Sequence, residues 1–149
     1  MDASIEIQIK NLLKPFRIRT GVTYSFLFNS DGLVIAIDQE SLNEDEDFYQ
    51  SISAICAGII LFAEQGIMMT DNSSNVKEIV IQGGNQIESD SFTITIDFIS
   101  DEIIFACIFP SVLNYSVIKF ELKNTTQSLI KLFNIEDMGE NTSIEQIKT

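Results

Sequence analysis

The sequence predicts an α+β domain, an α/β sandwich in which helices and strands follow one another in the order αββαβββα. Three segments carry apolar residues at every third or fourth position, as on one face of a helix. Five shorter segments are rich in β-branched and aromatic residues and are bounded by turn residues, as strands are. With 149 residues, the chain is long enough for one domain with a substantial core.

The first helix is predicted over 3–14. Ile5, Ile9 and Leu13 fall at helical spacing. Pro15 is expected to end this helix near Lys14, because proline disfavours helical backbone in the residue that precedes it.

A β-hairpin is predicted next, with strands at 22–29 and 33–37. Aromatic residues occupy every second position of the first strand, from Tyr24 to Phe28. The segment Asn29–Gly32 is expected to form the turn, because its glycine can adopt a positive φ.

An acidic loop over 38–47 leads into a second helix, predicted over 47–65 and ended by Gly66. One broad face of this helix is expected to cover the sheet: Phe48, Ile52, Ile55, Ile59 and Phe62, flanked by Cys56, Ile60 and Ala63. The opposite side is small and apolar at its centre and polar at its edges: Gln50, Ser53, Ala54, Ala57, Gly58, Leu61, Glu64 and Gln65.

Within this helix, the segment 54–63 has no polar side chain. Its ten residues are too few to span a membrane, which needs about 20. A helix that is apolar all round needs a cover on more than one side. Gly58 costs about 1 kcal/mol in a helix interior, which a close approach of a second helix would offset. The alternative is that Ala54, Ala57 and Gly58 are simply small exposed residues.

Three strands are predicted in the second half, at 76–82, 92–98 and 103–109. The last of these is apolar on both faces, so it should be central in the sheet with helices on either side. A third helix is predicted over 112–134. The polar and acidic segment 136–149 is predicted to be a loosely held tail after a domain at 1–135.

The composition argues against several classes of function. The net charge of −13 disfavours binding to nucleic acid or to an anionic membrane surface. The chain has no histidine, no cysteine pair at metal-binding spacing and no phosphate-binding loop, so neither catalysis nor a cofactor nor a metal is expected. Cys56 and Cys107 are expected to be buried thiols. The first residues lack the pattern of a signal peptide, which predicts a cytoplasmic protein.

Three segments, together with the order of elements, resemble the Roadblock family of dynein-light-chain-like proteins. The segment 21–36 resembles the family's opening hairpin, 76–81 its third strand and 114–122 the start of its last helix. The resemblance covers about residues 3–134. The related longin fold fits less well, because a longin lacks the leading helix and typically ends in two helices.

The resemblance implies a profilin- or longin-like architecture. The sheet would have five antiparallel strands in the order 2-1-5-4-3, with the first and third helices on one face and the second helix on the other. Roadblock proteins have no catalytic residues of their own. They act as dimeric platforms that bind or regulate small Ras-like GTPases, or that join motor and membrane-scaffold complexes.

The family pairs through its second helix and the edge of its third strand. On this chain, the resemblance places the pairing surface at Ala54, Ala57, Gly58, Leu61, Val76, Ile79 and Ile81. Partner-binding residues would be Gln50, Ser53, Glu64 and Gln65. Arg17 and Arg19 are expected to lie exposed beside the sheet rather than to enter a partner's active site.

Three hypotheses for function follow. The first is a homodimer, or a heterodimer with a paralogue, that regulates or scaffolds a small Ras-like GTPase. It would not insert into a membrane. The second is a monomeric profilin- or longin-like module that binds actin or trafficking proteins. The third is a small-ligand sensor or a minor enzyme.

Overall fold

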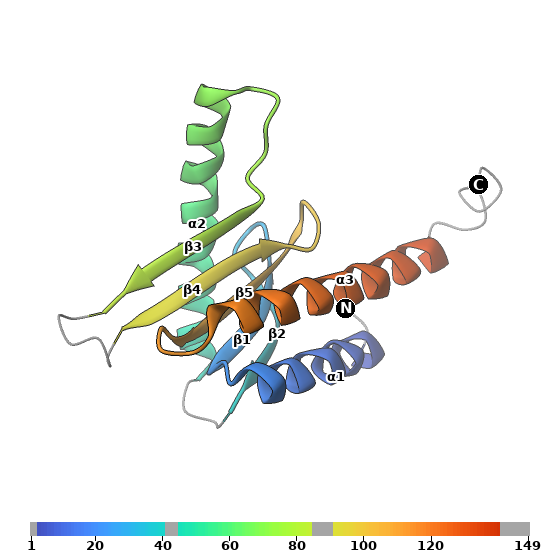
Figure 1. Cartoon of the computed structure of the whole chain (residues 1–149). Helices are drawn as coiled ribbons and strands as arrows, with labels where there is room; N and C mark the ends of the chain where they lie inside the picture. Colours follow the sequence, from blue (N-terminus) through green and yellow to red (C-terminus); the bar gives the residue numbers. More distant parts are fainter. Residues whose placement is uncertain (1–2, 41–44, 85–90, 141–149) are drawn as a thin grey trace.

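The computed structural model describes residues 3–40, 45–84 and 91–140 (Figure 1). The predicted order αββαβββα is confirmed. The elements are α1 (Ala3–Thr20), β1 (Tyr24–Asn29), β2 (Val34–Gln39), α2 (Glu46–Thr70), β3 (Glu78–Gly83), β4 (Phe92–Phe98), β5 (Ile103–Pro110) and α3 (Tyr115–Glu140).

The five strands form one sheet in the order β2-β1-β5-β4-β3, with every neighbouring pair antiparallel. This is the predicted order. The central position of β5 is confirmed, because its residues are almost all buried from both sides. β2 and β3 are the two edge strands.

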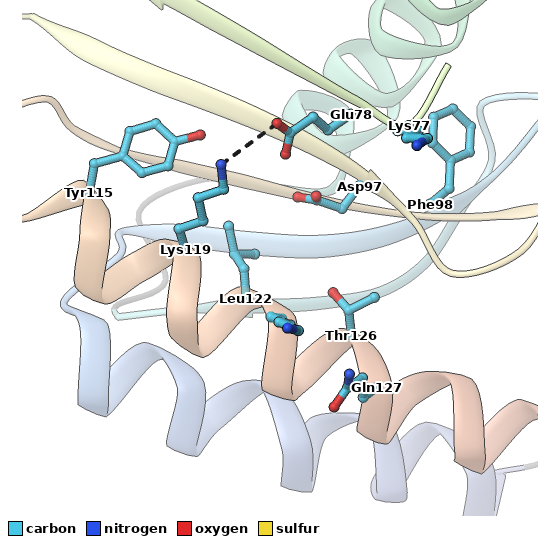
Figure 2. Close-up of a pocket in the computed structure, with 10 residues that line it drawn as sticks. Lys77, Glu78, Asp97, Phe98, Tyr115, Lys119, Leu122, Thr126 and Gln127 are labelled. Atoms are coloured by element: carbon cyan, nitrogen blue, oxygen red, sulfur yellow. Dashed lines mark ion pairs between the residues drawn. The ribbon is translucent and has the colours of Figure 1, made fainter. Parts of the chain in front are cut away.

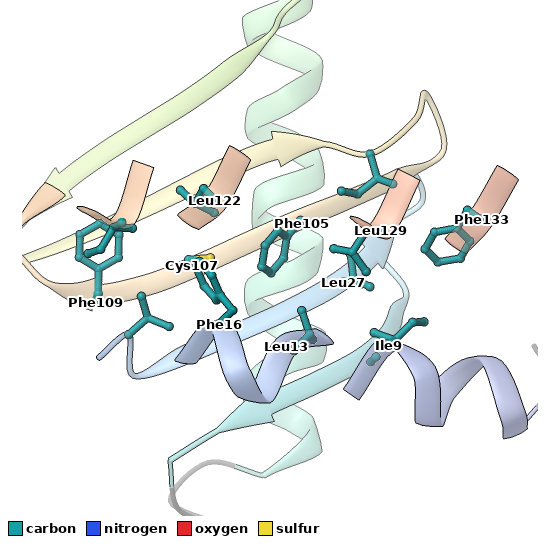
Figure 3. Packing of buried hydrophobic residues seen from close by; sticks show 14 of the residues in the cluster. Ile9, Leu13, Phe16, Leu27, Phe105, Cys107, Phe109, Leu122, Leu129 and Phe133 are labelled. Carbon is teal, nitrogen blue, oxygen red and sulfur yellow. The ribbon is translucent and has the colours of Figure 1, made fainter. Parts of the chain in front are cut away.

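The sheet has a hydrophobic core on each face. On one face, α1 and α3 pack side by side and cover the large core shown in Figure 3, in which Phe16 meets Phe105 edge to face. On the other face, α2 alone covers a smaller core around Tyr49, Phe26 and Phe28. Figure 1 shows α2 crossing behind the sheet and continuing past the end of the strands.

α1 does not end at Pro15 as predicted, but runs through it to Thr20. The residues after the proline are held by tertiary contacts: Phe16 is fully buried, and the Arg17 guanidinium lies 2.7 Å from the Asp38 carboxylate. These contacts outweigh the backbone hydrogen bond that a proline removes. The helix ends at Gly21, which has a φ of 80° and donates its N–H to the Arg17 carbonyl.

α2 is longer than predicted at its C-terminal end. Asp45 caps its start by accepting the Phe48 N–H at 3.1 Å. At the other end, Gly66 lies inside the helix rather than after it, and the helix continues to Thr70. A single glycine costs only about 1 kcal/mol in a helix interior, which the flanking apolar turns can absorb.

α3 begins at Tyr115, where Asn114 accepts the N–H groups of Ser116 and Val117. It continues to Glu140 and so includes the first residues of the predicted tail. The remainder of that tail, 141–149, and part of the acidic loop, 41–44, lie outside the described residues.

Candidate functional site

The face of α2 that meets the sheet agrees with the prediction at Cys56 and Ile60 but is rotated from its predicted centre. The fully or nearly fully buried residues of the helix are Tyr49, Ser53, Cys56 and Ile60. The expected sheet-facing residues Ile55 and Phe62 are instead 58% and 76% exposed. The rotation follows from Tyr49, whose large ring packs edge to face on Phe26 and Tyr24 and whose hydroxyl donates to the Gln39 side chain.

Ser53 cannot serve as a partner-binding residue, so this prediction was wrong. Its side chain is fully buried between the helix and the sheet, and its hydroxyl has no hydrogen-bond partner within the described ranges. A small polar residue can be buried there because Tyr49 and Cys56 fill the core around it. Of the other predicted partner-binding residues, Gln50 and Gln65 are exposed and Glu64 is half-buried.

Ala54 and Ala57 lie against the turn of the β1–β2 hairpin. A Cβ atom placed on Gly32 would lie 3.0 Å from the Ala54 Cα atom and 3.4 Å from the Ala57 Cβ atom. The close approach of the turn therefore explains the small side chain of Ala57, whereas Ala54 meets the turn through its backbone and is itself exposed. Gly58 has no atom within 4 Å of such a Cβ position, and Leu61 is 60% exposed, so these two predicted pairing residues remain accessible.

A continuous apolar stripe runs along the flank of α2. Its members alternate in steps of four and three residues, as in a helix that pairs with another helix, and Gly66 falls in the same series. We call this set the α2 stripe: Phe48, Ile52, Ile55, Ile59, Phe62 and Met69. Phe48, Ile52 and Ile59 are half-buried, whereas Met69 is 89% exposed.

The α2 stripe borders an apolar groove over the uncovered part of the sheet. Phe48 and Ile52 line one wall, and residues of β1, β4 and β5 line the remainder, in a cavity of about 520 Å³. Toward the edge of the sheet, Ile79 and Ile81 of β3 are half-buried on this same face and pair in register with Ile96 and Ile94 of β4. Val76 precedes β3 and is also half-buried.

α2 is strongly apolar, although only a small part of it is buried. Glu64 is the only charged residue between Phe48 and Thr70. Within the described part of the chain, α2 is the one helix long and apolar enough to cross a membrane by length and composition, and only 22% of its most apolar window is buried. The chain itself covers one side of this helix and leaves the other apolar side to water.

A second cavity, of about 350 Å³, lies between α3 and the β3–β4 edge (Figure 2). Asp97 of β4 and Glu78 of β3 are direct cross-strand partners, so two carboxylates lie side by side on its sheet wall. Lys119 of α3 reaches Glu78 at 4.0 Å, an exposed and weak ion pair. Burial, and next the charge of Glu78, raise the pKa of Asp97 to about 6.

Asp97→Asn is expected to stabilise the protein at pH 7.5. The pKa of Asp97 is raised from 3.8 to about 6, so the folded chain keeps a proton that the unfolded chain releases between these values. The protonated Asp97 carboxyl therefore favours the folded chain, and this contribution to stability is lost as the pH rises from 3.8 to about 6. Above that range, the folded chain bears the full cost of ionising a largely buried carboxyl. The variant should gain on the order of 1–3 kcal/mol in free energy of unfolding at pH 7.5.

Urea unfolding at pH 7.5 and pH 4.5 measures this difference, and the gain should shrink at the lower pH. Asp101→Asn, at an exposed position in the β4–β5 turn, is the matched control. An equal gain at both pH values would show that titration of Asp97 is not its cause.

The two arginines are held in ion pairs. Arg17 is mostly buried with Asp38, so the expectation that it lies exposed was wrong; it ties α1 to β2. The half-exposed Arg19 lies 2.8 Å from Glu121 and links α1 to α3. Both side chains thus contribute to the packing of the helix layer.

Neither cysteine is placed for chemistry. Cys56 and Cys107 are buried and unpaired, on opposite faces of the sheet. Burial raises the pKa of Cys56 to about 11 and that of Cys107 well above its usual value, so both are poor nucleophiles at neutral pH. Among the described residues, no group of three or more acidic or cysteine side chains could hold a metal ion.

Comparison with known proteins gives a consistent result. A family model described as the Roadblock/LC7 domain matches residues 8–87. The fold is similar to that of the gliding protein MglB from Thermus thermophilus, with a TM-score of 0.74, 16% identity, and coverage of 89% of this chain and 93% of that one. No curated protein sequence shows a significant match.

Two further solved structures share the fold. An MglB described as having a tetrameric arrangement has a TM-score of 0.75 and 15% identity, with 89% of this chain and 92% of that one covered. A Roadblock/LC7 domain from Streptomyces avermitilis has a TM-score of 0.66 and 16% identity, with 79% and 91% covered.

Proposed function

The chain belongs to the Roadblock/LC7 domain family, and on that premise we propose that it is a non-catalytic, dimeric platform for a small Ras-like GTPase. The platform acts in the cytoplasm and takes no part in chemistry itself. Its role is to present a fixed surface, built from two copies of the chain, to a protein partner.

One observation carries the dimer: the partly exposed α2 stripe and the apolar side chains of the edge strand β3 lie on the same face of the sheet. An exposed apolar helix flank and an open strand edge are each a hazard for aggregation in a monomer. A second copy of the chain satisfies both at once. Its β3 supplies hydrogen bonds to the open edge, and its α2 supplies apolar contacts to the stripe.

The pairing surface proposed here is therefore centred on the flank of α2 rather than on its small residues. Ile55, Ile59 and Phe62 form the helix part of the seam, and Ile79 and Ile81 form the sheet part. Gly58 and Leu61 border this seam, Ala54 is also exposed, and only the Ala57 side chain packs against the Gly32 turn.

The polar residues next to the seam supply the surface for a partner. Gln50 is exposed near the start of α2, and Gln65 is exposed near its end, where Glu64 is half-buried; a twofold pair displays each of these residues twice. Glu64 is the one charge on this part of α2. Since charges at the rim of an interface govern the rate of association more than its strength, partner binding should depend on ionic strength.

Two measurements test the proposal in order. Sedimentation equilibrium of the full chain should give twice the monomer mass at micromolar concentration, and a monomer would favour the rival hypothesis of a monomeric protein-binding module. The protein is then used as bait for the Ras-like GTPases of its own cell, loaded with GDP or with a non-hydrolysable GTP analogue. A partner retained in one nucleotide state supports the platform, and a dimer that retains none contradicts the GTPase role.

A further inference from the structure

We propose that the cavity between α3 and the β3–β4 edge (Figure 2) binds a small zwitterion, namely an amino acid with an apolar side chain. The ammonium group of this ligand would lie on the sheet wall, against Asp97 and Glu78. Its carboxylate would lie against the lysines of α3. The site is separate from the proposed dimer surface, because α2 covers the opposite face of the sheet.

The cavity has the size and the lining that such a ligand needs. Its volume of about 350 Å³ lies near the lower end of the range for small-molecule sites, about 300–1,000 Å³. Two carboxylates and three lysines line it, and Phe98 and Leu122 add apolar surface. This mixture suits a ligand that carries both charges and a short apolar part, rather than an anion or an apolar molecule.

The sheet wall provides the position for the ammonium group. Asp97 and Glu78 are direct cross-strand partners, and among the described residues the Asp97 carboxylate has no hydrogen bond or ion pair. A bound ammonium group would pair with this largely buried carboxylate and offset its repulsion by Glu78. A ligand that requires this charge also accounts for a carboxylate that costs the fold stability, since functional sites often retain destabilising groups.

The helix wall provides the position for the carboxylate. Lys119 and Lys123 are four residues apart, so they lie on the same side of α3. Lys119 reaches across the cavity to Glu78 at 4.0 Å, whereas Lys123 lines the cavity without an ion pair among the described residues. Figure 2 shows Tyr115 one turn before Lys119, where its hydroxyl can donate a further hydrogen bond. Two ammonium groups and a hydroxyl on one wall can therefore hold a ligand carboxylate.

Titration calorimetry of the full chain with leucine at neutral pH tests the proposal. Leucine should bind, and two analogues that each lack one charged group should bind at least about tenfold more weakly. Isocaproate lacks the amine of leucine, and isoamylamine lacks its carboxylate. Equal binding of leucine and either analogue would overturn the zwitterion, and no binding of leucine at millimolar concentration would overturn the site itself.

Two substitutions test whether the ligand lies in this cavity. Asp97→Asn should weaken leucine binding by about tenfold or more, and unfolding cannot cause this loss because the variant is expected to be more stable than the native chain. Lys123→Gln should weaken binding by removing a partner of the ligand carboxylate. Asp101→Asn and Lys131→Gln are the matched controls, at exposed positions outside the cavity. If all four variants bind leucine as the native chain does, the ligand lies elsewhere and the inference is wrong.

The outcomes distinguish this inference from the proposed function. A monomer that binds leucine through Asp97 and Lys123 would support the site and contradict the dimeric platform. A dimer that retains a GTPase but does not bind leucine would support the platform and contradict the site.

Discussion

Replacing Phe62 by glutamate is expected to convert the dimer into a folded monomer. Phe62 is 76% exposed in the single chain, so the substitution leaves the monomer's core untouched. In the proposed dimer, it lies in the middle of the α2 stripe and would place an unpaired carboxylate in the seam twice. An uncompensated buried charge costs about 3–5 kcal/mol, so the dissociation constant should rise by more than about 100-fold.

Sedimentation equilibrium measures the mass, and circular dichroism verifies that the variant is folded. Ile7→Glu is the matched control, since Ile7 is a helical residue with a similar exposure, 59%, on the opposite layer. Leu61→Glu adds a directional test, because Leu61 is 60% exposed but lies about 100° further round the helix. Loss of the dimer with Leu61→Glu but not with Phe62→Glu would move the seam to the side first indicated by the sequence.

The fold could be predicted because local signals and the family resemblance agreed. Alternation in β4, the turn at Asn29–Gly32 and the doubly apolar β5 each predicted one element, and the sheet order then followed from the resemblance. Helix ends were harder to predict. At Pro15, a local breaker was overruled by tertiary contacts that only the folded chain reveals, and at Gly66 the cost of about 1 kcal/mol for a glycine did not end the helix.

The orientation of α2 could not be predicted from the sequence. A helix with apolar residues on nearly every side has no single buried face, so its rotation depends on tertiary packing. Tyr49 determined that rotation, although it was absent from both predicted faces. The periodic stripe from Phe48 to Phe62 was predicted to face the chain's own sheet, but it lies at the margin of the buried face: Ile55 and Phe62 are exposed, and Phe48, Ile52 and Ile59 are half-buried.

The same reasoning explains the error at Ser53 and the role of the small residues. A serine on a helix is normally exposed, and nothing in the local sequence indicates that Ser53 lies on the buried side of α2. Ala54 and Ala57 were predicted to admit the close approach of a second helix, which remains a prediction. The element that approaches them within the chain is the turn at Gly32, which was itself predicted but not placed.

Gly32→Ala is accordingly expected to be among the most damaging small substitutions in this protein. Gly32 has a φ of 84°, which costs an L-residue about 1–2 kcal/mol. The added Cβ atom would also lie 3.0 Å from the Ala54 Cα atom, and a helix backbone cannot yield as a flexible side chain can. With overpacking costing a further 1–3 kcal/mol, the free energy of unfolding should fall by roughly 2–5 kcal/mol.

Thermal and urea unfolding at one fixed protein concentration measure this loss, with Asp31→Ala as the control in the same turn. Asp31 is exposed, so its replacement should change stability by less than about 0.5 kcal/mol. Equal effects of the two substitutions would mean that the turn does not press on α2. A selective loss at Gly32 that exceeds the roughly 1–2 kcal/mol of positive-φ strain would show that the turn also presses on the α2 backbone.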